Sequence, residues 1–115
     1  MGQSDNHINY VEFKAKNLEK IKSFYSNCFN WSFQDYGSDY IAFSDSGLDG
    51  GFERSEDEIV NGVLVVLYHS DLKKIKESII ENQGIISKDI FSFPGGQRFH
   101  FIDPAGNELA IWSES

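Results

Sequence analysis

Two six-residue stretches, NLEKIK at positions 17–22 and DLKKIK at positions 71–76, are nearly identical and decide the fold. Each begins with Asn or Asp, which cap helix N-termini, and continues with apolar residues at the spacing of an amphipathic helix. A β-rich apolar run precedes each stretch, and three short apolar segments with turn residues between them follow it. The sequence therefore predicts the order β-α-β-β-β twice, as in a duplicated module. The expected strands lie near 8–13, 31–33, 40–43 and 51–53, and near 62–68, 85–90, 98–102 and 108–112.

A second repeat marks the ends of the two units. FSDSG at positions 43–47 resembles IDPAG at positions 102–106, and the charged stretch 54–58 between the units is typical of an exposed linker. We expect one domain over residues 1–115, with module one at about 7–54 and module two at about 61–113.

Composition and charge exclude several classes of partner. A chain of 115 residues with 40% hydrophobic content has enough apolar residues for one packed core. The net charge of −8 would repel nucleic acid and acidic membrane surfaces. A single cysteine, Cys28, cannot form an intramolecular disulfide, and no segment has the pattern of a signal peptide or membrane span. We therefore expect a cytoplasmic protein with no nucleic-acid or membrane partner.

Several segments resemble the vicinal oxygen chelate superfamily, which includes glyoxalase I, ring-cleaving dioxygenases and bleomycin-resistance proteins. They are HINYVEF at 7–13, the following Asn17-Leu18, Phe24-Tyr25 and Phe29-Asn30-Trp31, and the closing FIDPAGNEL at 101–109. The resemblance implies an α+β fold in which two βαβββ modules form a cupped eight-stranded mixed sheet with two outer helices. The cup would enclose a small-molecule cavity.

The superfamily's divalent metal ion is held by four side chains, on the first and fourth strands of each module. The pattern of the superfamily points to Tyr10, Gly51, Leu64 and Ala110 in this sequence. Three of these residues have no side-chain donor for a metal ion. We therefore expect no metal cofactor. The alternative is a divalent metal at a relocated site made by His7, Glu12, His100 and Glu108.

Strand alternation predicts which side chains share the concave face. Five of them are expected to converge as a ligand site: Tyr10, Glu12, Tyr68, Glu108 and Trp112. Two carboxylates among aromatic rings could act as general acid and base, or could bind a cationic ligand. The alternative is that Glu12 and Glu108 are exposed or paired with Lys14 or Arg98.

The functional prediction is a metal-free, small-molecule-binding protein of the glyoxalase type. The alternatives are a lyase, isomerase or dioxygenase of that type, with or without a metal, and a regulatory interaction domain; no catalytic residue is assigned. The resemblance and the strand edges expected in such a fold indicate a homodimer. His100 is predicted to be a hydrogen-bonded structural residue and Cys28 a packing residue. The aromatic segment 91–97 is either a gating loop or a simple hairpin.

Overall fold

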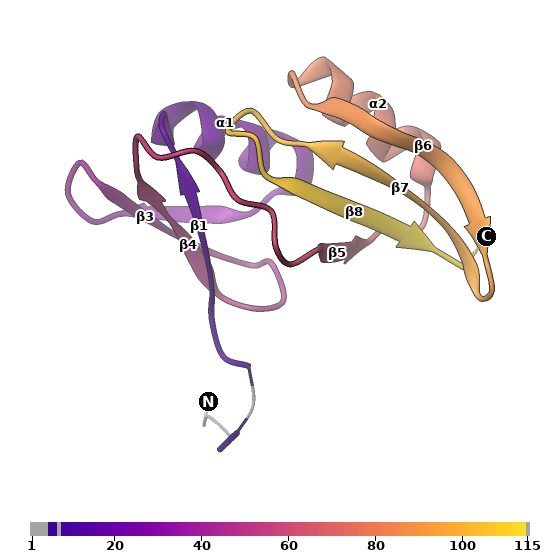
Figure 1. Ribbon diagram of the computed structural model, residues 1–115, viewed down its shortest axis with the longest axis horizontal. Coiled ribbons are helices and arrows are strands. Elements are labelled where there is room, and N and C mark those ends of the chain that lie inside the picture. Colours follow the sequence, from indigo (N-terminus) through magenta and orange to yellow (C-terminus); the bar gives the residue numbers. More distant parts are fainter. Residues whose placement is uncertain (1–4, 7, 115) are drawn as a thin grey trace.

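The computed structural model describes residues 5–6 and 8–114, which contain two modules with the same order of elements. Figure 1 shows this order along the chain, and it confirms the predicted α+β fold of two βαβββ units. Module one consists of β1 (Val11–Ala15), α1 (Leu18–Phe29), β2 (Ser32–Asp35), β3 (Tyr40–Ser44) and β4 (Gly50–Arg54). Module two consists of β5 (Val65–Tyr68), α2 (Leu72–Glu81), β6 (Ile85–Phe93), β7 (Gly96–Ile102) and β8 (Glu108–Ser113).

Each module forms its own four-stranded mixed sheet. The strand orders are β1-β4-β3-β2 and β5-β8-β7-β6, and the first strand of each module runs parallel to the fourth. In the described part of the chain, β1 pairs only with β4 and β5 only with β8, so each is an edge strand. The eight strands of the predicted cup are thus divided into two halves within one chain.

Both helices begin where the sequence predicts. The side chain of Asn17 accepts a hydrogen bond from the backbone N–H of Lys20 at 3.0 Å, and Asp71 caps α2 through Lys74 at 3.1 Å. The helix α1 packs on β2 and β4, the helix α2 packs on β6, β7 and β8, and the two helices touch. Within the described residues, neither helix is both long and apolar enough to span a membrane.

The strands that open the modules start later than the sequence suggests. The run at 8–13 becomes a strand only at Val11, which pairs with Gly50 at the start of β4. Likewise β5 begins at Val65, which is opposite Leu109. Each of these strands has a single partner, so it begins where the partner's hydrogen-bonding groups become available.

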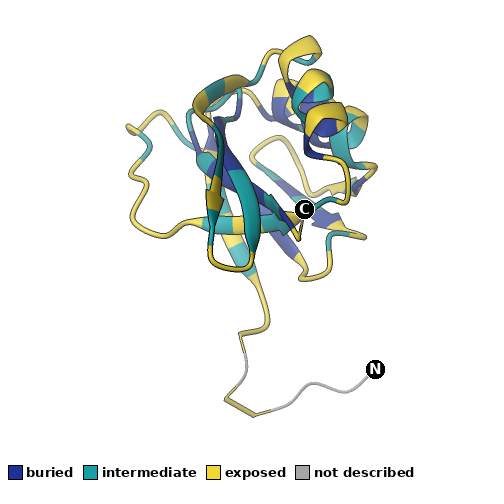
Figure 2. Cartoon of the chain, turned by 90° about the vertical axis from the view of Figure 1, so that its right-hand side faces the viewer, coloured by how far each residue is buried: buried dark blue, intermediate teal, exposed yellow. Residues whose placement is uncertain are grey.

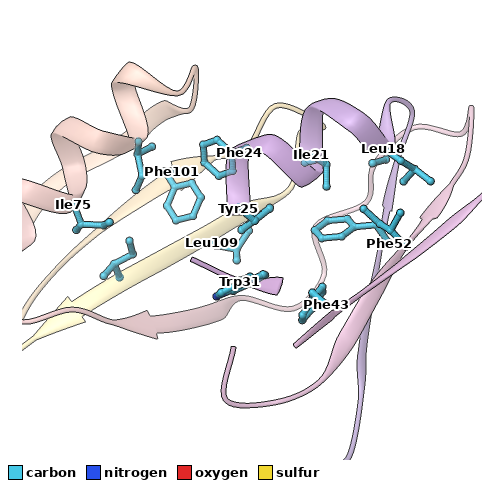
Figure 3. Close-up of a cluster of buried hydrophobic side chains, with 14 of the residues drawn as sticks. Leu18, Ile21, Phe24, Tyr25, Trp31, Phe43, Phe52, Ile75, Phe101 and Leu109 are labelled. Atoms are coloured by element: carbon cyan, nitrogen blue, oxygen red, sulfur yellow. The ribbon is translucent and has the colours of Figure 1, made fainter. Parts of the chain in front are cut away.

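One aromatic core joins the two modules (Figure 3). Tyr25 stacks on Trp31 with ring centroids 4.6 Å apart, and Phe24 of module one lies 6.0 Å from Phe101 of module two. In Figure 2 the dark blue buried segments lie on the strands and the helices, whereas many of the loops are yellow and exposed. Burial of these rings holds the modules in a single body, because apolar area removed from water is the main favourable term in folding.

The turn at 103–107 ties module two to module one. The Oδ1 atom of Asp103 accepts the backbone N–H groups of Ala105, Gly106 and Asn107 at 2.8–3.0 Å. Its Oδ2 atom accepts the Tyr25 hydroxyl at 2.9 Å and the Asn107 amide at 3.2 Å. Gly106 has φ +106, which few other residues adopt. Burial raises the pKa of both the Asp103 carboxyl and the Tyr25 hydroxyl.

The aromatic segment 91–97 is a hairpin rather than a loop. Phe91 and Phe93 end β6, Gly96 begins β7, and the turn between them has Gly95 at φ +114. The register of β6 against β7 shifts between Ile86 and Lys88 and again between Lys88 and Phe91. The hairpin alternative is thus confirmed.

Candidate functional site

A cavity of about 570 Å³ lies along the unpaired edge of β1. We call it the linker cavity; its walls are residues 10–14, residues 58–63 of the linker, and Val65, Asn107 and Glu108. The side chain of Asn61 attaches the linker to module two. Its amide donates to the carbonyl oxygen of Gly106, and its oxygen accepts the backbone N–H of Glu108, both at 3.0 Å. The cavity is therefore built from both modules.

The linker cavity brings together three of the five predicted site residues: Tyr10, Glu12 and Glu108. The other two, Tyr68 and Trp112, do not line it. Their rings contact each other edge to face at 5.2 Å. The structure does not bring all five together, because β1 belongs to one four-stranded sheet and β5 and β8 to the other, and in the described chain β1 pairs with neither of them.

A hydrogen-bonded chain of two tyrosines ends on Glu12. The Tyr40 hydroxyl donates to Oε1 of Glu12 at 3.0 Å, and the Tyr10 hydroxyl lies 2.6 Å from that of Tyr40. Desolvation and these bonds raise the pKa of Tyr40, so its hydroxyl stays protonated at neutral pH. Sequence reasoning missed Tyr40. The available signal was Gly51, because a residue without a side chain leaves room for a large neighbour on the same face.

A second set of polar side chains surrounds Glu108. Its Oε2 atom lies 3.1 Å from Nδ1 of His100 and accepts the Ser87 hydroxyl at 3.3 Å. Because the Glu108 carboxylate can only accept this hydrogen bond, we place the imidazole proton of His100 on Nδ1. His100 is only 8% exposed, and its Nε2 is buried with no hydrogen-bond partner in the described structure.

The alternative prediction for the two glutamates is correct in one part: Glu12 is exposed and Glu108 is partly buried, but neither is paired with Lys14 or Arg98. Lys14 lies 3.8 Å from Asp57, and the Arg98 guanidinium lies over the rings of Phe91 and Phe93. Glu12 and Glu108 instead receive hydrogen bonds from tyrosine, histidine and serine. The prediction that His100 is hydrogen-bonded is confirmed, and its partner is Glu108.

Three of the four residues that the resemblance places at metal positions cannot ligate a divalent ion. Gly51 and Ala110 are buried and Leu64 is partly exposed, and none has a donor atom. A side chain at position 51 would collide with the Tyr40 hydroxyl. Across the described ranges, no three His, Cys, Asp or Glu side chains are grouped so as to hold a metal. His7, a member of the alternative relocated site, lies outside those ranges.

A second cavity, of about 610 Å³, lies between the modules. Its walls include Phe29, Trp31, Leu48 and Tyr68, together with Cys28. The Cys28 thiol is half-buried and donates to the carbonyl oxygen of Ser78 at 3.6 Å, and burial raises its pKa. A thiol with a raised pKa is a poor nucleophile, in keeping with a packing role.

Known structures share this architecture. A glyoxalase/bleomycin resistance protein/dioxygenase family enzyme from Burkholderia phytofirmans PsJN is 12% identical, with a TM-score of 0.82 over 93% of this chain and 98% of that one. The fosfomycin resistance protein FosX from Listeria monocytogenes is 15% identical, with a TM-score of 0.82 over 97% and 96%. Lactoylglutathione lyase from Agrobacterium tumefaciens is 14% identical, with a TM-score of 0.74 over 96% of both chains. No protein-family model and no curated protein matches the sequence. Over nearly its whole length, the chain has the fold of the glyoxalase and bleomycin-resistance proteins.

Proposed function

We propose that this chain is a cytoplasmic small-molecule-binding protein that holds its ligand in the linker cavity without a metal ion. One observation carries the proposal: the cavity gathers Tyr10, Glu12 and Glu108 beside an apolar wall. Its volume of about 570 Å³ lies within the ~300–1,000 Å³ of typical ligand pockets. A few polar groups in an otherwise apolar hollow are the usual composition of such a pocket.

A fragment screen followed by amide chemical shifts tests the location of the site. We expect the shifted amides to lie in β1, in the linker and near Glu108. Val63→Trp should abolish these shifts, because Val63 lines the cavity but is itself exposed, so a larger side chain can fill the hollow without disturbing the core. The matched control is Ile85→Trp, at an exposed position outside the cavity. Shifts that survive Val63→Trp would place the site elsewhere.

The metal-free part of the proposal is supported by the side chains at positions 51, 64 and 110, which have no donor atoms. Elemental analysis of protein purified without chelators, and calorimetric titration with zinc, nickel, manganese and iron(II), test it. We expect no stoichiometric binding. Near-stoichiometric metal that is lost in Glu12→Ala or Glu108→Ala would contradict this part and favour metal-dependent catalysis.

The His100–Glu108 pair favours a second candidate, a metal-free enzyme that transfers a proton. Glu108 lines the cavity, so its carboxylate is the group that could take a proton from a ligand there, while the Nδ1–H of buried His100 holds that carboxylate in place. In that case His100→Phe, which removes this N–H, would lower turnover of a bound carbon acid more than its affinity. Equal losses of affinity and turnover would indicate a structural role for His100.

We also propose a homodimer. Apolar side chains on β5 are exposed in the single chain, among them Val66 at 44% and Tyr68 at 51%. In the described part of the chain, no strand pairs with the outer edge of β1 or of β5. Exposed apolar faces and open edges are the features that a second copy would cover.

A further inference from the structure

The hydrogen bonds in the walls of the linker cavity have a consistent direction, and from it we infer that the ligand is an organic cation with a protonated amine and an apolar body. This inference rests on the proposed binding function and adds the chemical class of the ligand. It depends on which wall groups still have a hydrogen to donate and which have a free lone pair.

The tyrosine chain presents only an acceptor to the cavity. Tyr40 has one hydroxyl hydrogen and donates it to Glu12, so Tyr10 must be the donor in the 2.6 Å bond between the two hydroxyls. Tyr10 lines the cavity and Tyr40 does not. The hydroxyl oxygen of Tyr10 therefore has only lone pairs left to offer a ligand, and the ligand must supply the hydrogen of that bond.

The two glutamates present further acceptors. Tyr40 occupies Oε1 of Glu12, which leaves Oε2, and the bonds from His100 and Ser87 both go to Oε2 of Glu108, which leaves Oε1. The hydrogen bond with buried His100 also holds the Glu108 carboxylate in place. An ionised carboxylate accepts hydrogen bonds and donates none. A ligand with N–H groups fits these atoms, and a carboxylate or phosphate ligand does not.

The side-chain amides in the cavity wall are used by the protein itself. Asn107 donates both amide hydrogens, one to the carbonyl oxygen of Lys14 and one to Asp103. Asn61 uses its amide to attach the linker. Lys14 is the one cationic side chain among the described residues that line the cavity, and it lies 3.8 Å from Asp57. The two amides therefore offer no hydrogen to an anion, and the ammonium group of Lys14 is shared with Asp57.

The charge of the cavity wall and its apolar residues also favour an organic cation. The lining contains the carboxylates of Glu12, Glu58 and Glu108 against the single ammonium group of Lys14. The chain as a whole carries a net charge of −8, which raises the local concentration of cations. Exposed Val60 and Val63 form an apolar wall that would cover a hydrocarbon or aromatic body.

Three probes of similar shape and different charge test the inference: phenethylammonium, 2-phenylethanol and 3-phenylpropionate. Each is titrated into the full chain at pH 7 and low salt, with affinity read from amide chemical shifts. We expect phenethylammonium to bind roughly tenfold more tightly than the alcohol, and the anion to bind most weakly. Added salt should weaken the cation most.

Variants separate a specific site from a general attraction between charges. Glu12→Gln and Glu108→Gln should each weaken phenethylammonium about three- to tenfold, while Glu77→Gln on exposed α2 is the matched charge control and should leave it unchanged. Tyr40→Phe frees the Tyr10 hydrogen, so the preference for the amine over the alcohol should shrink. Tyr36→Phe, at an exposed tyrosine outside the cavity, is its control.

Each contrary outcome has a definite meaning. Tighter binding of 3-phenylpropionate in the cavity would overturn the cation inference and leave the binding function in place. So would phenethylammonium binding that neither Glu12→Gln nor Glu108→Gln alters. If none of the three probes shifts the cavity amides, both the inference and the proposed function fail.

Discussion

Replacing Asp103 by Asn should destabilise the protein by about 3 kcal/mol. The carboxylate accepts three backbone N–H groups on Oδ1 and two side-chain donors on Oδ2. An asparagine keeps one oxygen for the backbone but turns an NH₂ group toward the donors of Tyr25 and Asn107. Two buried hydrogen bonds to a charged group are lost, each worth roughly 1.5–3 kcal/mol, and part of this loss is offset because a buried charge is removed.

Urea denaturation followed by circular dichroism measures the effect. For a chain of 115 residues, 3 kcal/mol corresponds to a fall in Tm of roughly 10–15 °C. Tyr25→Phe removes one donor and leaves no buried group unpaired, so it should lower the free energy of unfolding by about 1 kcal/mol. Asp71→Asn is the control, because Asn17 shows that asparagine caps the equivalent helix. A loss under about 1 kcal/mol for Asp103→Asn, with an unchanged m-value, would refute this role for the turn.

Three other predictions test different parts of the structure. Desolvation raises the pKa of Tyr25 and of Tyr40 well above the ordinary value, so absorbance at 295 nm above pH 10 should show fewer ionised tyrosines in the folded protein than in the unfolded chain. The stability that these two hydroxyls contribute is present below about pH 10, the pKa of a tyrosine in the unfolded chain, and is lost as pH rises further; equal ionisation of the folded and unfolded protein would be contrary evidence. Gly51→Ala should lower the free energy of unfolding by roughly 1–3 kcal/mol in thermal melts, because its Cβ atom would collide with the Tyr40 hydroxyl and with the backbone oxygen of Ile41. An unchanged Tm would show that both the Tyr40 side chain and the strand at Ile41 can give way at no cost. Sedimentation equilibrium should give a dimer at micromolar concentration that Val66→Asp converts to a monomer, whereas a monomeric wild type would rule the dimer out.

The fold was largely predictable because its signals are local. Helix caps at Asn17 and Asp71 depend on a side chain three residues before its partner, and the turn around Asp103 is made within five consecutive residues. The division of the strands into two sheets was not predictable from such patterns. It depends on whether the edges of β1 and β5 meet, which is decided by packing between the modules.

The site was predictable only in part, for a related reason. Alternation along one strand places Glu12 with Tyr10, but the partner of Glu12 comes from β3, two strands away in the sheet. The bond between His100 and Glu108 likewise joins β7 and β8, and the linker that closes the cavity has no periodic pattern. Lateral contacts of this kind depend on the register between strands, which the sequence does not reveal.

Gly51 and Tyr40 together limit how the chain can evolve. A single substitution that places a carboxylate at position 51 would drive its side chain into the Tyr40 hydroxyl, so it should unfold or distort the sheet before it can bind an ion. Removing Tyr40 first relieves only part of this collision, because the backbone oxygen of Ile41 also lies too close to position 51, and it leaves Glu12 without its hydrogen-bond donor. The substitution at position 51 should cost less once Tyr40 is gone, so the two positions are epistatic, although each step keeps a penalty of its own. We expect lineages with a tyrosine and a glycine at these positions to recover a metal ligand rarely, and only through a destabilised intermediate.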